Sequence, residues 1–143
     1  MERAAAHYDR QPIRDESDLV VARRRARELA IAQGLSEVAV EALATAVSEV
    51  GWNIIVHAGN GELLFGAIAN AAGRGVVVIA RDAGPGIADI QQAMQDGYST
   101  KSGLGDGLPG ARRLVDEFEI ESRPGVGTTV TLRKWERAQG GTP

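Results

Sequence analysis

The feature that most constrains the fold is a short apolar run that leads into an acid and a glycine-proline turn. Residues 76–80 read VVVIA and continue as Arg81-Asp82-Ala83-Gly84-Pro85-Gly86-Ile87. A run this short, without polar alternation, is typical of a strand buried on both faces. Glycine allows close approach to the backbone, and proline pre-sets a turn. We therefore predict that Asp82 is held rigidly at a strand end, beside a gap for a flat ligand. The alternative is a surface turn with a solvated carboxylate.

The composition fits one soluble domain. The chain has 143 residues, of which 43% are hydrophobic and 24% charged, enough for a single core. Its net charge of -3 argues against general nucleic-acid binding, which favours a basic face. The lack of cysteine excludes disulfides and thiolate metal sites. Because the sequence shows neither an apolar run of about 18 residues nor a signal-peptide core, we expect a cytoplasmic protein without a membrane span.

Two amphipathic segments predict helices over residues 15–33 and 36–57, with Gly34 between them as a stop signal. In the second helix, Glu49 and Asn53 are four residues apart, so both project from one face. That face borders the apolar stripe of the helix. The two side chains are therefore either a solvated polar pair or part of a functional site, and their spacing alone does not decide.

The remaining segments predict a two-layer α/β sandwich, with a mixed, mostly antiparallel sheet and helices on one face. Predicted strands cover residues 11–14 at an edge, 62–69, 76–82, 117–121 and 126–135, and short helices cover 89–95 and the stretch after Pro109. On the last strand Thr128 shares its phase with Val130 and Leu132, so its hydroxyl should face the core. The alternative is that Thr128 was selected only for its high propensity to form a strand at an edge. We expect one domain over 11–135, with disordered ends at 1–10 and 136–143.

The glycine-rich stretch from Asp96 to Gly110 predicts an anion site. A glycine-rich loop that enters a helix offers free N–H groups and the positive end of the helix dipole, and phosphate is the usual anion there. Residues 105–110 also match G-x-G-x-x-G, but no strand precedes them, so a dinucleotide fingerprint is not indicated. The spacing of a Walker loop is absent.

Taken in order, these motifs resemble the Bergerat-fold ATPases, the superfamily of the DNA gyrase ATPases, Hsp90 chaperones, histidine kinases and MutL proteins. The resemblance rests on Glu49 with Asn53, then Asp82-x-Gly84-x-Gly86, then Gly103-x-Gly105-x-Gly107, then Gly127-Thr128. The chain lacks the phospho-acceptor and dimerisation helices of a histidine kinase. It is most similar to the small anti-sigma-factor-type serine/threonine kinases. Within them, residues 41–49 (EALATAVSE) and 107–118 (GLPGARRLVDEF) most resemble the switch kinase of the bacterial stressosome.

The resemblance implies a role for each candidate residue. Asp82 would accept a hydrogen bond from the adenine amine, with Thr128 sharing a bridging water. Gly84 and Gly86 would let the base lie against the backbone. Asn53 would hold Mg²⁺, and Glu49 would be the general base. The phosphate loop and its lid would be formed by Ser99, Thr100, Lys101, Gly103, Leu104, Gly105, Gly107 and Leu108. Asp106 departs from the small or apolar residue that is usual in this loop.

The resemblance also implies a function: an ATP- and Mg²⁺-dependent kinase that phosphorylates serine or threonine on STAS-domain partners in a bacterial stress-response or sigma-factor pathway. In its free form such a kinase also activates a PP2C-type phosphatase. Two alternatives stay open. One is a non-catalytic nucleotide-binding switch that sequesters a sigma factor, although sequestration needs no base such as Glu49. The other is a detached histidine-kinase module that acts on a histidine elsewhere.

Overall fold

Five strands form one sheet in the computed structural model, which describes residues 5–87, 94 and 107–136. The strands are β1 (Tyr8–Ile13), β2 (Gly61–Asn70), β3 (Gly73–Asp82), β4 (Glu117–Arg123) and β5 (Gly127–Trp135), in the spatial order β1-β2-β3-β5-β4. Neighbouring strands are antiparallel at every pairing among the described residues. The predicted mixed sheet is therefore corrected to an antiparallel one. Tight turns join β2 to β3 and β4 to β5, and a tight turn makes neighbouring strands antiparallel.

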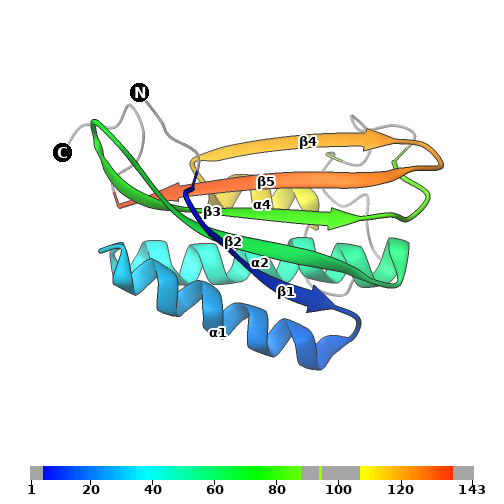
Figure 1. Cartoon of the computed structure of the whole chain (residues 1–143), viewed down its shortest axis with the longest axis horizontal. Coiled ribbons are helices and arrows are strands. Elements are labelled where there is room, and N and C mark those ends of the chain that lie inside the picture. The colour runs from blue at the N-terminus through cyan, green and yellow to red at the C-terminus, as the bar shows by residue number, and fades with distance from the viewer. Residues whose placement is uncertain (1–4, 88–93, 95–106, 137–143) are drawn as a thin grey trace.

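The helices α1 (Glu16–Ala32), α2 (Glu37–Ala58) and α4 (Leu108–Leu114) contribute to the same core, and Figure 1 shows α1 and α2 running along one face of the sheet. The predicted two-layer sandwich is confirmed. Asp15 caps α1 by accepting a hydrogen bond from the Asp18 amide at 3.2 Å, and Ser36 caps α2 through the Ala39 amide at 3.1 Å. The helix predicted over residues 89–95 lies outside the described residues, apart from Met94.

Strand β3 is buried on both faces, as its apolar run predicts. Val76 and Val78 pack into the main core with α2, whereas Val77 faces the opposite side with Ile68 and Trp135. Tyr8 packs against that second cluster, so β1 begins three residues before the predicted strand and within the stretch expected to be disordered. The predicted boundary was wrong because the partners of Tyr8 lie far away in the sequence.

The C-terminal boundary also differs from the prediction at its first residue. Glu136 was assigned to the disordered tail, yet its amide donates to the Arg74 carbonyl at 2.8 Å. Its carboxylate in turn accepts from the Arg74 amide at 2.7 Å. Nearby, the buried amide of Gln33 donates to the carbonyls of Ile68 and Gly75. The turn between β2 and β3 is thus fastened to both the end of α1 and the residue after β5.

Helix α2 is long and apolar enough to cross a membrane, judged by length and composition alone. Its apolar residues, however, form the centre of the core. Leu43, Val47, Val50 and Ile54 are at most 2% exposed and pack against the sheet. Burial inside the domain therefore accounts for the hydropathy of this helix.

Candidate nucleotide site

Asp82 is the last residue of β3, and one of its two carboxylate oxygens is hydrogen-bonded within the turn that follows. Its Oδ1 accepts a hydrogen bond from the Gly84 amide at 2.9 Å, which fixes the carboxylate relative to the turn. Its Oδ2 takes no hydrogen bond from any residue that the structure describes. Asp82 therefore presents a held acceptor at the strand end, as predicted. Hollows of about 350 and 250 Å³ adjoin it, one on the β2 side and one on the β5 side.

The two glycines of the turn are required by the protein's own packing. A Cβ on Gly84 would lie 2.6 Å from the Cβ of Ala58, at the end of α2. Gly86 has a φ of 78°, and a Cβ there would lie 2.4 Å from the Arg123 carbonyl oxygen. These contacts bring the turn against α2 on one side and against the β4–β5 hairpin on the other. Close approach of an adenine to the same glycines stays a prediction.

The β4–β5 hairpin holds the turn with two further hydrogen bonds. The Gly125 amide donates to the Pro85 carbonyl at 2.7 Å, and the Ile87 amide donates to Ser122 Oγ at 2.6 Å. Ser122 lies in β4 and was not among the predicted site residues. It could have been found from the sequence, because it continues the inward phase of Phe118 and Ile120 with a hydroxyl in place of an apolar side chain.

Thr128 faces inward, as its phase on β5 predicts, and is only 6% exposed. It lies opposite Asp82 in the β3–β5 register. Its Oγ1 lies 2.9 Å from Ser122 Oγ, where either hydroxyl can be the donor. A carboxylate and a hydroxyl are thus brought side by side from two neighbouring strands.

Glu49 and Asn53 project from one face of α2, and the alternative of a solvated pair is wrong for Glu49, which is 7% exposed. Asn53 is partly buried one turn further along. The helix continues to Ala58, which lies against the position of Gly84, so the C-terminal end of α2 meets the Asp82 turn. A buried carboxylate followed by an amide oxygen is a donor set suited to proton acceptance and to a hard cation.

Part of the predicted phosphate loop can be placed. Gly107 has a φ of 64° and precedes α4, with Pro109 in the first turn. The side chain of Leu108 is 3% exposed and belongs to the core, so only its backbone remains for a ligand. The other predicted residues of this loop, which lie outside the described residues, are Ser99, Thr100, Lys101, Gly103, Leu104 and Gly105.

The described residues contain no cluster of three or more histidine, cysteine or acidic side chains that could hold a metal ion by itself. A cation at Asn53 would therefore take most of its ligands from a phosphate group and water. Magnesium commonly binds in this way, with few protein ligands and several waters. The residues present thus fit Mg²⁺ delivered together with a polyphosphate, and they do not fit a permanent structural metal.

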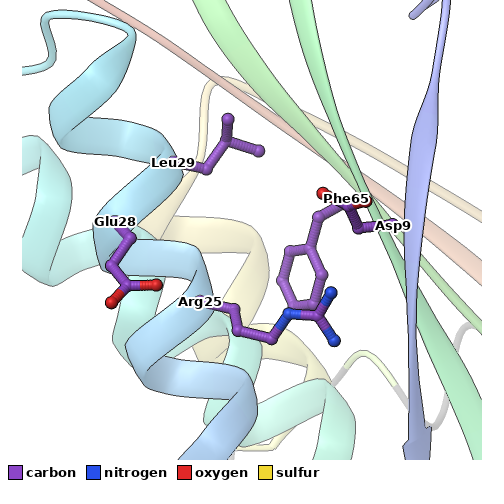
Figure 2. Close-up of a pocket in the computed structure, with 5 residues that line it drawn as sticks. All are labelled: Asp9, Arg25, Glu28, Leu29 and Phe65. Atoms are coloured by element: carbon purple, nitrogen blue, oxygen red, sulfur yellow. The ribbon is translucent and has the colours of Figure 1, made fainter.

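A further hollow, of about 260 Å³, lies between α1 and the edge strand β1 (Figure 2). Arg25 reaches across it toward Phe65, with its guanidinium 5.9 Å from the ring centroid. The same guanidinium donates to the Arg10 carbonyl at 3.0 Å and to the side chain of Gln11 at 2.8 Å. Gln11 in turn donates to the Pro12 carbonyl at 3.1 Å. These contacts occupy two backbone carbonyls of the edge strand β1, which makes them less available for pairing with another chain.

Comparisons with known proteins agree with this geometry. The family described as "Histidine kinase-like ATPase domain" matches residues 13–134. Serine/threonine-protein kinase RsbT of Bacillus subtilis (strain 168) is 43% identical over 125 residues, which cover 87% of this chain and 94% of that protein. An anti-sigma F factor of Thermoanaerobacter sp. (strain X514) is 36% identical over 95 residues, covering 64% of this chain and 66% of that one.

A solved structure supports the fold alone. The crystal structure of the SiaB–SiaC complex from Pseudomonas aeruginosa contains a chain that superposes with a TM-score of 0.57 at 16% sequence identity. The superposition covers 91% of this chain and 89% of the other. The arrangement of strands and helices is therefore shared well beyond recognisable sequence similarity.

Proposed function

Because the chain belongs to the family of histidine kinase-like ATPase domains, we propose that it is an ATP-dependent serine/threonine kinase that acts as a partner switch. The observation that carries the proposal is the buried carboxylate of Glu49, one turn from Asn53 on the helix that ends against the Asp82 turn. A module that only binds nucleotide needs no buried carboxylate there. The similarity to RsbT, which extends over most of both chains, supports the same conclusion.

Each site residue has a distinct task in this reaction. Asp82 accepts from the adenine amine, and Thr128 lies beside it on the neighbouring strand. Asn53 would hold Mg²⁺, which neutralises charge on the phosphates when bound. Glu49 accepts the proton of the attacking hydroxyl while the bond from the γ-phosphorus to the bridging oxygen breaks and a new bond forms to the hydroxyl oxygen. The backbone around Gly107 contributes N–H groups to the phosphate loop.

The acceptor that we propose is a serine or threonine on a STAS-domain partner. The relatives named a serine/threonine kinase and an anti-sigma factor support a role in partner switching. Activation of a PP2C-type phosphatase by the free form belongs to the same proposal, as does a cytoplasmic location. The binding switch and the histidine-kinase module are the competing functions. Phosphate on serine or threonine survives acid, whereas phosphate on histidine does not.

The experiment that tests this function compares two variants on one helix face. Glu49→Gln keeps the size of the side chain and removes the proton acceptor, so ATP affinity should persist. Transfer of labelled phosphate to a STAS-domain protein encoded beside this chain should fall by roughly 10²–10⁴-fold. Asn53→Ala removes the cation ligand, so Mg²⁺-dependent ATP affinity and phosphate transfer should both fall.

Three results would contradict the proposal in different ways. Transfer at the wild-type rate by Glu49→Gln would remove Glu49 as the base. Tight ATP binding by the wild type without label on any partner would favour the binding switch. Label that is lost in acid would favour the histidine-kinase module.

A further inference from the structure

Ser122 joins three separate parts of the candidate adenine site. Its Oγ accepts a hydrogen bond from the Ile87 amide at 2.6 Å, directly after the Asp82 turn. The same oxygen lies 2.9 Å from Thr128 Oγ1 and 3.3 Å from the Gly127 carbonyl. Ser122 therefore connects β4 both to the turn that follows β3 and to the threonine on β5.

The proton count of the two hydroxyls limits what Thr128 can do. Ser122 has one proton to donate, and the acceptors within reach are Thr128 at 2.9 Å and the Gly127 carbonyl at 3.3 Å. The shorter contact has ordinary hydrogen-bond length, whereas the longer one is at the weak limit. When Ser122 donates to Thr128, the proton of Thr128 is left to point elsewhere. No residue in the described parts of the chain accepts it.

We propose that Ser122 is a positioning residue for adenine recognition: it orients the Thr128 hydroxyl as a donor beside the acceptor Asp82. This inference rests on the proposed function. Adenine presents a donor amine next to the acceptor N1, and an acceptor carboxylate next to a donor hydroxyl is its complement. Guanine presents an acceptor carbonyl next to a donor N1–H. Its acceptor would face the acceptor Asp82, and its donor would face the donor hydroxyl of Thr128. Ser122 therefore contributes to the choice between the two bases without touching either.

The test measures ATP and GTP affinity by calorimetry for Ser122→Ala and Ser122→Thr. In Ser122→Ala the Thr128 hydroxyl can turn to suit either base, so ATP affinity should fall roughly three- to tenfold while GTP affinity stays level or rises. The ratio of ATP affinity to GTP affinity should therefore fall by at least the same factor. Ser122→Thr keeps the hydroxyl and should restore the preference. In Ser122→Ala the amide proton of Ile87 should also exchange faster with solvent, because its acceptor is gone.

Two further variants separate positioning from general stability. Ser36→Ala removes the cap of α2, away from the Asp82 turn, so it should lower the unfolding midpoint and leave the ATP/GTP ratio unchanged. Thr128→Val removes the hydroxyl that Ser122 orients. It should narrow the ratio as Ser122→Ala does, and the double variant should add nothing, because both act on one hydrogen bond.

Equal losses of ATP and GTP affinity in Ser122→Ala would show a merely structural role and overturn the inference. Unchanged affinities, or additive effects in the double variant, would also overturn it. A wild-type protein that binds neither nucleotide would overturn the proposed function itself. Retained ATP preference in Ser122→Ala, with a wild type that prefers ATP, would overturn the inference alone.

Discussion

The two carboxylate oxygens of Asp82 have different roles: Oδ1 stabilises the turn, and Oδ2 is the acceptor proposed for adenine. Because Oδ1 is bound to the Gly84 amide, Asp82→Asn can keep that bond through its carbonyl oxygen and place an NH₂ group where Oδ2 was. The turn should therefore survive. ATP affinity should drop by at least about 1.5 kcal/mol, the scale of a charge-assisted hydrogen bond, and GTP affinity should not drop with it. Calorimetry with both nucleotides measures the effect, and an unchanged unfolding midpoint is the control. Equal wild-type affinity for ATP and GTP would contradict the adenine assignment.

At the scale of elements, the end of α2 and the Asp82 turn are fitted to each other through one glycine. A Cβ on Gly84 would lie 2.6 Å from Ala58 Cβ and 2.9 Å from Ala58 Cα. Gly84→Ala should therefore push the turn away from α2, costing about 1–3 kcal/mol of unfolding free energy and weakening ATP binding. Denaturant unfolding and calorimetry measure the two effects.

The matched control for that change lies on the helix. Adding Ala58→Gly to Gly84→Ala removes the nearer of the two clashing atoms, so stability should recover in part, since Ala58 Cα remains. Ala58→Gly alone should lower stability slightly, because glycine is a weaker helix former than alanine and Gly84 in the wild type makes no clash that the change could relieve. If the double variant is no more stable than Gly84→Ala, contact with Ala58 is not the reason for glycine at this position.

Local signals in the sequence were sufficient for the elements and for part of the site. The cap at Ser36 and the burial of β3 on both faces follow from residue type and spacing. The role of Ser122 depends on Ile87 and Thr128, which reach it only through the pairing of β4 with β5. The glycines were read as space for a ligand, whereas the fold itself fills that space with Ala58 and Arg123. Such contacts are set by distant segments, which periodicity cannot report.

For the whole molecule, paired carboxylates set the response to acid. Hydrogen bonds from Arg10 and Arg81 hold the pKa of Glu62 below its ordinary value, and those from the Arg14 side chain and amide do the same for the pKa of Asp18. A carboxylate with a lower pKa in the folded state stabilises the fold above its unfolded pKa. The free energy of unfolding should therefore fall as the pH drops below about 4–5, through the unfolded and then the folded pKa values.

Denaturant unfolding between pH 3 and pH 7 (roughly the range in which carboxylates titrate) measures this response. Glu62→Gln should lower stability at pH 7 and flatten the dependence on pH, since one of the responding groups is gone. A variant at the exposed acid Glu28, Glu28→Gln, is the control and should keep the wild-type profile. An unchanged slope in Glu62→Gln would contradict the prediction, because it would mean that the pKa of Glu62 is not lower in the folded state than in the unfolded chain.

The guarded edge of β1 has a consequence for how this protein behaves in a crowded solution. A sheet grows into fibrils by adding strands, and growth starts where backbone donors and acceptors are open. At β1 the Arg10 and Pro12 carbonyls are occupied by side chains, and Pro12 has no N–H to offer. At the opposite edge, β4 carries Glu117, Glu119 and Glu121 on one side, and Arg133 of β5 pairs with the first two. We therefore expect fibril growth by strand addition to be disfavoured at the β1 edge, where part of the backbone is already occupied.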